Sequence, residues 1–96
     1  MEKARKLTED EIRSRMDRLP GWEFTGGKLH RELRFKDFAQ AFGFMTSLAL
    51  VAEKMNHHPD WSNVYHRVVI DLSTHDVGGV SDRDFELAAV VNEFVG

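Results

Sequence analysis

Residues 37–56 read DFAQAFGFMTSLALVAEKMN, and this stretch predicts the longest helix of the chain. Its apolar side chains recur at helical spacing along two stripes. The first stripe consists of Phe38, Phe42, Met45, Ala49 and Ala52, and the second consists of Phe44, Leu48, Val51 and Met55. A helix in a small two-layer domain needs only one buried face. The second stripe therefore favours self-association, and deeper burial within a monomer is the alternative.

Extended segments flank this helix on both sides. Residues 22–25 and 28–35 precede it, and the Gly-Gly dipeptide between them predicts a hairpin turn. Residues 61–65 and 67–73 follow it and are rich in Val, Ile, Tyr and Trp, which is typical of strands. The pattern alone leaves open whether these later residues form one long strand or two.

The same signal predicts a helix start near each end of the chain. Thr8 with Glu11, and Ser81 with Asp84, have the spacing of a capping box. In the last segment, the spacing of a buried helix face is found at Leu87, Val90, Val91 and Phe94. The element order is therefore α-β-β-α-β-β-α. This order indicates an α+β fold of two layers, with helices packed on one face of an antiparallel sheet.

Composition bounds the domain count and excludes several classes of function. The 96 residues suffice for a single domain, residues 1–96, and are too few for two. Lys and Arg number 13 against 16 Asp and Glu, and this net charge of −3 without a basic run argues against direct nucleic-acid binding. The absence of cysteine excludes disulfides, thiolate metal sites and a cysteine nucleophile. No apolar stretch reaches the roughly 20 residues that a bilayer requires, so we expect a soluble, cytoplasmic protein without a membrane partner.

Histidines carry the chemistry that the sequence suggests. His57 and His58 lie just past the long helix, and His75 lies just past the last strand. If these two segments meet, three imidazoles share one pocket, with Asp76 and Asp60 in reserve. Imidazole titrates near neutral pH, so such a cluster can hold an acid and a base at once.

Spacing alone leaves three interpretations of this cluster open. The His-His-Pro segment can be a solvated turn, a catalytic site, or a zinc or iron site of three histidines or of two histidines with Asp76. Against a metal, adjacent side chains on an extended backbone point apart, and the chain has no H-x-x-x-H or H-x-H pair. For His30 and His66 a structural or solvated role is the simpler interpretation.

Six blocks of sequence closely resemble the pterin-4a-carbinolamine dehydratase family, whose animal member is also called the dimerization cofactor of a hepatocyte nuclear factor. The blocks are FKDF at 35–38, AFGFM at 41–45, EKMNHHPDW at 53–61, NVY at 63–65, LSTHD at 72–76 and SDRD at 81–84. The resemblance runs from about Leu7 to Phe94, in order and with matching spacing.

The resemblance implies a fold, an assembly and a reaction. The fold is a four-stranded antiparallel sheet with helices on one side, which requires two strands between Trp61 and Ser73. Family members form homodimers or homotetramers. The implied reaction dehydrates a 4a-hydroxytetrahydropterin to the quinonoid dihydropterin, which recycles the pterin after aromatic amino acid hydroxylation, and it uses no metal or organic cofactor. The alternative is a protein-binding dimerization cofactor that acts on a protein partner through its helical face.

The resemblance also assigns the site residues. It places His57, His58 and His75 at the reacting centre and leaves open which is the acid and which the base. Together with these histidines, the matching ligand-binding positions are Asn56, Ser73, Thr74 and Asp76. The animal proteins usually carry glutamate where this chain has Asp76, which is one methylene shorter.

Overall fold

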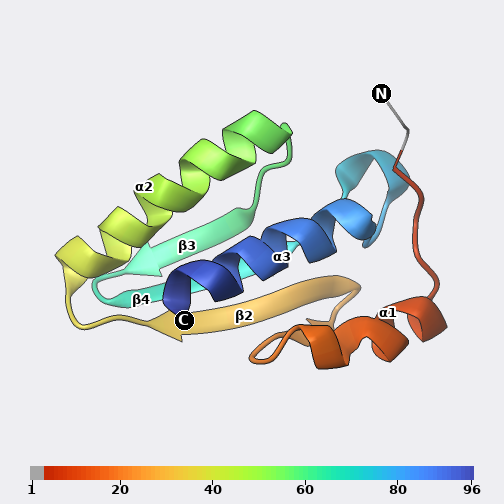
Figure 1. Cartoon of the computed structure of the whole chain (residues 1–96), viewed down its shortest axis with the longest axis horizontal. Coiled ribbons are helices and arrows are strands. Elements are labelled where there is room, and N and C mark those ends of the chain that lie inside the picture. The colour runs from red at the N-terminus through yellow and green to blue at the C-terminus, as the bar shows by residue number, and fades with distance from the viewer. Residues whose placement is uncertain (1–3) are drawn as a thin grey trace.

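A four-stranded antiparallel sheet and three α-helices build residues 4–96, the part of the chain that the computed structural model describes (Figure 1). The helices are α1 (Glu9–Arg15), α2 (Phe38–Met55) and α3 (Asp82–Val95). The strands are β1 (Glu23–Thr25), β2 (Lys28–Arg34), β3 (Asp60–Val64) and β4 (Arg67–Leu72), and two short 3-10 helices are η1 (Met16–Arg18) and η2 (His75–Val77). The predicted order is confirmed, and the residues after α2 form two strands.

The strand order β1-β2-β4-β3 places β2 and β4 at the centre of the sheet. Their register sets Leu29 opposite Leu72 and Leu33 opposite Val68. Because side chains alternate between the two faces of a strand, all four of these side chains lie on one face, where they are buried. Figure 1 shows α2 and α3 over the sheet, so this apolar face forms the core beneath the two helices.

Helix α2 begins and ends at the predicted residues. The Asp37 side chain accepts a hydrogen bond from the backbone N–H of Gln40 at 2.8 Å, and Asn56 closes the helix in the left-handed conformation. The helix buries Ala41, Phe44, Leu48 and Ala52. Its outer face exposes Phe38 and Phe42, which are 48% and 56% exposed. The prediction that the second stripe is left free for self-association is therefore wrong, because the sheet covers the second stripe and leaves most of the first exposed.

Helix α3 starts with the predicted capping box, in which Ser81 and Asp84 exchange hydrogen bonds with each other's backbone N–H groups. Its buried face consists of Asp84, Leu87, Ala88 and Val91. The predicted face is correct at Leu87 and Val91 but wrong at Phe94, which is 46% exposed. The buried face begins one turn earlier than predicted because it includes a carboxylate, which apolar periodicity does not count.

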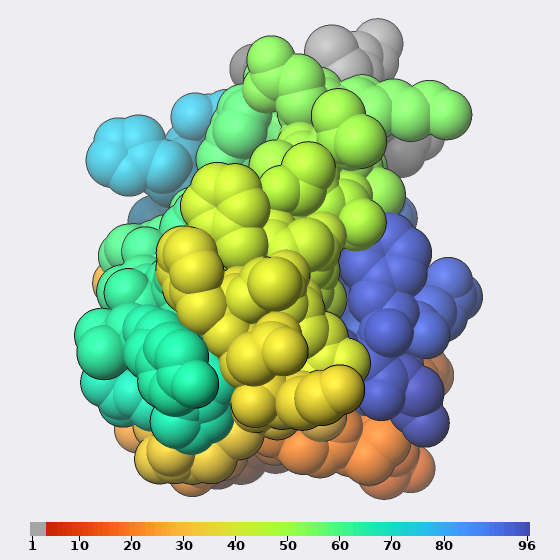
Figure 2. All heavy atoms as spheres, turned by 90° about the vertical axis from the view of Figure 1, so that its left-hand side faces the viewer, coloured from red at the N-terminus to blue at the C-terminus, as the bar shows by residue number. Residues whose placement is uncertain are grey.

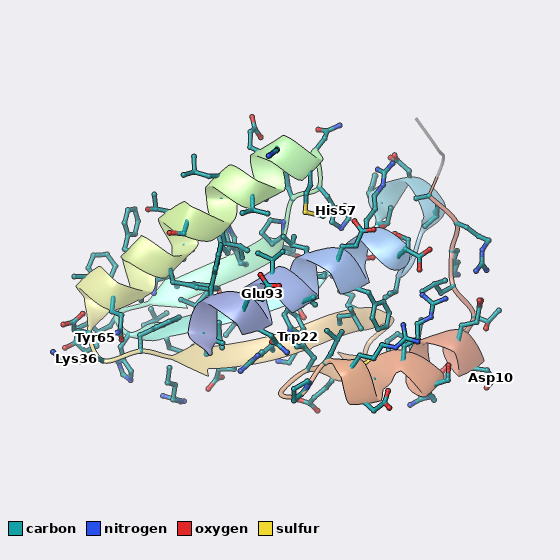
Figure 3. The ribbon with its side chains drawn as sticks, in the orientation of Figure 1. Asp10, Trp22, Lys36, His57, Tyr65 and Glu93 are labelled. Atoms are coloured by element: carbon teal, nitrogen blue, oxygen red, sulfur yellow. The ribbon has the colours of Figure 1, made fainter. Side chains whose placement is uncertain are left out.

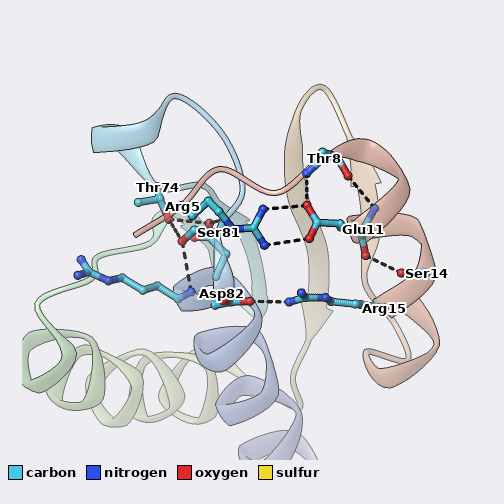
Figure 4. Close-up of polar contacts among 10 residues, drawn as sticks. Arg5, Thr8, Glu11, Ser14, Arg15, Thr74, Ser81 and Asp82 are labelled. Atoms are coloured by element: carbon cyan, nitrogen blue, oxygen red, sulfur yellow. Dashed lines mark hydrogen bonds and ion pairs between the residues drawn. The ribbon is translucent and has the colours of Figure 1, made fainter. Parts of the chain in front are cut away.

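The N-terminal segment is fixed at both of its sides (Figure 4). The backbone N–H of Leu7 donates to the carbonyl of Val80 at 2.8 Å, which attaches the segment to the loop before α3. Arg5 donates two hydrogen bonds to Glu11, at 3.0 and 2.9 Å. These bonds to Arg5, with a further one from the backbone of Thr8, lower the pKa of Glu11 to about 2. These hydrogen bonds hold the N-terminal segment beside the loop that follows β4.

Within residues 4–96, no helix combines the length and apolar character needed to cross a bilayer.

Candidate functional site

His57 is turned into the protein at the end of α2. Asn56 has φ 53°, and this left-handed turn directs the following backbone N–H of His57 to the carbonyl of Ala52 at 3.0 Å. The His57 side chain is consequently buried, with only 6% of the residue exposed. Figure 3 shows it between the end of α2 and the start of α3. Its Nε2 lies 2.6 Å from Oδ1 of Asp84.

Asp84 joins three separate parts of the chain through its buried carboxylate. Besides the contact with His57, its Oδ2 accepts hydrogen bonds from Oγ1 of Thr74 at 2.8 Å and from the backbone N–H of Ser81 at 2.9 Å. The residue is 0% exposed. Three donors compensate its burial, as a buried carboxylate requires. The end of α2, the end of β4 and the start of α3 therefore meet at one carboxylate.

The contact with Asp84 also orients the imidazole of His57. A carboxylate oxygen accepts hydrogen bonds, so the 2.6 Å contact favours the His57 tautomer with its proton on Nε2. The basic nitrogen of the neutral ring is then Nδ1. Asp84 is thus a positioning residue for His57.

His58 points away from its neighbour. Its Nε2 lies 2.8 Å from Oε1 of Glu53, and both side chains are largely exposed. The prediction that adjacent imidazoles on an extended backbone diverge is therefore confirmed.

His75 lies in η2, where the chain leaves β4. It lines a pocket of about 230 Å³ together with Ser73, Thr74 and the turn between β1 and β2. Thr74 is buried, and its Oγ1 lies 2.5 Å from Oγ of Ser81. Asp76 is exposed, and within residues 4–96 its carboxylate has no hydrogen-bond or ion-pair partner.

The structure brings the two histidine-bearing segments together through an intermediary. His57 and Thr74, the neighbour of His75, contact the two oxygens of the same Asp84 carboxylate. His57 and His58 do not line the pocket that holds His75. Sequence reasoning missed Asp84 and Glu53 as site residues. The available signal for Asp84 was an acidic residue one turn before Leu87 on the buried stripe of α3.

The described residues 4–96 hold no group of three or more His, Cys, Asp or Glu side chains arranged for a metal ion. The divergence of His57 and His58 accounts for this, since only one of the two rings points toward the β4 end of the site.

Asn56 offers a test that separates stability from ligand binding. We expect Asn56→Gly to leave the free energy of unfolding about unchanged, because glycine adopts the left-handed conformation freely. We expect Asn56→Val to destabilise the protein by about 1–2 kcal/mol, because a branched side chain disfavours it. Chemical denaturation measures both values. If the Asn56 side chain also binds ligand, the glycine variant has a raised dissociation constant for that ligand, and an unchanged constant would remove Asn56 from the binding residues.

The fold and the site together define a class of protein. It is an α+β protein that holds a buried His-Asp-Thr network next to two exposed histidines. The sequence profile of the family described as pterin 4 alpha carbinolamine dehydratase matches residues 5–94. The chain belongs to this family.

Relatives and a solved structure agree with this membership. A protein of Solibacter usitatus assigned the name pterin-4-alpha-carbinolamine dehydratase is 58% identical over 84 residues, which cover 88% of each chain. A Burkholderia multivorans protein assigned the same name is 52% identical, over 91% of this chain and 87% of the relative. The crystal structure of a transcriptional coactivator/pterin dehydratase from Brucella melitensis superimposes with a TM-score of 0.91 at 43% identity, and covers 95% of this chain and 99% of that one.

Proposed function

We propose that the chain is a dehydratase that converts a 4a-hydroxytetrahydropterin to the quinonoid dihydropterin and water, in pterin recycling. The observation that carries this proposal is the shared Asp84 carboxylate, at which His57 meets Thr74 beside His75. Family membership, and the names assigned to relatives at 52% and 58% identity, support the same reaction.

The reaction needs two proton transfers around one carbon. The C4a–O bond breaks as a general acid delivers a proton to the leaving hydroxyl, which departs as water. The lone pair of the ring nitrogen forms the C=N bond, and a general base removes the proton from nitrogen. Side chains that titrate near neutral pH serve both tasks efficiently, and imidazole is the usual one.

The three histidines divide into two environments that suit these tasks. His58 and His75 are exposed and able to exchange protons with solvent between turnovers. His57 is buried and held in one orientation by Asp84. Ser73 offers its hydroxyl and backbone groups beside His75, and Thr74 lines the same pocket while Asp84 holds its hydroxyl. Asn56 and Asp76 flank the two segments. We assign these residues to holding the flat pterin ring.

A direct test is a spectroscopic assay with a 4a-hydroxypterin generated immediately before mixing. The compound dehydrates slowly by itself, so the spontaneous rate is the reference. We expect the protein to accelerate formation of the quinonoid product in proportion to its concentration. A rate that stays at the spontaneous value would refute the proposed function.

We expect this activity to persist in excess chelator. The nitrogen lone pair expels the hydroxyl group as water once a general acid has protonated that hydroxyl, so the histidines alone supply the proton transfers. The measurement is the same assay after dialysis against a strong chelator, with and without added zinc. Loss of activity that zinc restores would favour a metal site instead.

A second candidate function is binding to a protein partner, including a second copy of the chain, through the outer face of α2. Figure 2 shows the side chains of α2, yellow to green, across the centre of one face of the molecule. Phe38, Phe42 and Leu50 are exposed there, and Leu50 reaches 71%. Phe38 and Phe42 also contact each other, and large exposed apolar side chains are typical of interaction sites. The name transcriptional coactivator/pterin dehydratase of the Brucella melitensis structure fits the same possibility.

We expect sedimentation at micromolar concentration to show a homodimer or homotetramer rather than the 11.1 kDa monomer. Replacement Phe42→Glu puts a charge on the outer face of α2 and is expected to shift the protein toward smaller species. Glu86→Gln, at an exposed position on α3, is a control that should not change assembly. A wild-type protein that sediments only as a monomer would exclude this face as a self-association surface.

A further inference from the structure

The pocket that holds His75 adjoins a second pocket, with which it shares lining residues. The first has a volume of about 230 Å³, which is below the range of about 300–1,000 Å³ typical of small-molecule sites. The second, of about 470 Å³, is lined by the N-terminal segment, Phe24 and the end of the loop before α3. Both pockets are lined by Gly27, Gly78 and Gly79. We call the two adjoining pockets together the glycine groove, and the second alone lies within the size range of ligand sites.

The glycines keep this groove open. Gly27 and Gly78 have φ values of 76° and 68°, which disfavour any residue with a side chain. A Cβ atom built on either would meet nothing within 4 Å, so the space above both residues is free. At Gly79 a Cβ atom would lie 2.8 Å from Cε of Lys6, so the alkyl chain of Lys6 lies against this glycine.

The charges along the groove are mainly positive. Lys6 lines the far pocket, and within residues 4–96 it makes no ion pair. Lys28 lines the near pocket, and its only ion pair in the same range is a long one of 3.8 Å to Asp60. Glu9 is the single acidic lining residue of the two pockets, and it is engaged by Arg13 at 3.3 Å. The groove therefore offers two ammonium groups to a ligand.

We propose that the glycine groove binds the substituent of the pterin ring, and that it favours a substituent with an anionic group such as a phosphate. This inference rests on the proposed dehydratase function, which places the ring beside His75. A substituent that leaves the ring at this end enters a groove that already begins at His75 and leads toward Lys6. The lysines supply charge, and the glycines supply room for the chain that carries it.

Equilibrium binding of two stable compounds tests this subsite. The compounds are 6-hydroxymethyl-7,8-dihydropterin and its phosphate ester, measured by calorimetry. We expect the ester to bind about tenfold more tightly at low salt, since each exposed ion pair contributes up to about fivefold. The preference should shrink in 1 M salt, where the Debye length is about 3 Å.

Lysine variants locate the effect. Lys6→Gln and Lys28→Gln should each reduce the preference for the ester over the neutral compound by about threefold. Lys36→Gln removes the same charge at the opposite end of the molecule (Figure 3) and should keep the full preference. These side chains are at least partly exposed, so the variants should fold.

The outcomes separate this inference from the proposed function. Equal affinity for the two compounds, or a preference that Lys36→Gln reduces as much as Lys6→Gln, would overturn the subsite. The dehydratase proposal would then still stand if a neutral 4a-hydroxypterin is turned over. If neither compound binds and neither hydroxylated form is dehydrated, both proposals fail.

Discussion

Replacing Asp84 by asparagine is expected to lower kcat by about 10²-fold or more, the scale of one misdirected general acid or base. The carboxylate accepts from Thr74 and Ser81 and lies 2.6 Å from His57. A neutral amide has one acceptor oxygen, and its NH₂ group cannot accept from the remaining donors. The enforced tautomer of His57 is then lost together with the link to the β4 end of the site.

The same replacement should also reduce stability. Leaving a buried donor without its acceptor costs about 1–3 kcal/mol, and a small domain has about 5–15 kcal/mol in total. We therefore expect a folded protein with a lowered Tm. Circular dichroism verifies the fold, and turnover of the variant is measured well below its Tm.

Asp71→Asn is the matched control for Asp84→Asn. Asp71 contacts His30 at 2.7 Å, so it forms an equally short His-Asp pair on the opposite, open face of the sheet. The side chains of His30 and Asp71 are both about one third exposed. Replacing Asp71 should therefore change the free energy of unfolding by less than about 1 kcal/mol and leave turnover unchanged. If Asp71→Asn and Asp84→Asn lower kcat equally, Asp84 has no special role in positioning His57.

Alanine at His57, His58 or His75 is expected to lower dehydration by at least about 10²-fold in each case. The three variants should differ in stability. His58 and His75 are exposed, so their replacement should change the free energy of unfolding by less than about 0.5 kcal/mol. His57→Ala removes one of the three donors that compensate the buried Asp84 carboxylate and should destabilise by several times that amount.

The assay with freshly generated 4a-hydroxypterin measures these rates, and His30→Ala serves as the control outside the site. Wild-type turnover from all three variants would remove the catalytic assignment. Wild-type turnover from one of them would assign that histidine to ligand binding or to the fold alone.

Local signals predicted the elements because each depends on a few neighbouring residues. Asp37 caps the start of α2 with its side chain, and Asn56 closes the end with its backbone N–H. These hydrogen bonds span at most four residues. The capping box at Ser81 is equally local. Which stripe of α2 is buried depends on how the helix sits on the sheet, and periodicity does not contain that information. The exposed positions of Phe38, Phe42 and Phe94 follow from tertiary packing in the same way.

The same difference between local signals and tertiary packing explains why the candidate site was predicted only in part. The resemblance placed His57, His58 and His75 in one site, and chain position alone placed each at the end of a helix or strand. Asp84 is 27 residues from His57, and a helix-capping role fully explained it at the level of sequence. Only the fold shows that its carboxylate faces inward and that Thr74 and His57 share it.

Nuclear magnetic resonance of the five histidine side chains, during titration with a 7,8-dihydropterin, tests the central claim most directly. The claim is that the segments carrying His57, His58 and His75 surround one ligand. We predict that the ring signals of these three histidines shift together at one ligand concentration, while those of His30 and His66 stay in place. Shifts confined to His75, or to His57 and His58, would contradict the claim, because the two segments would then not share a site.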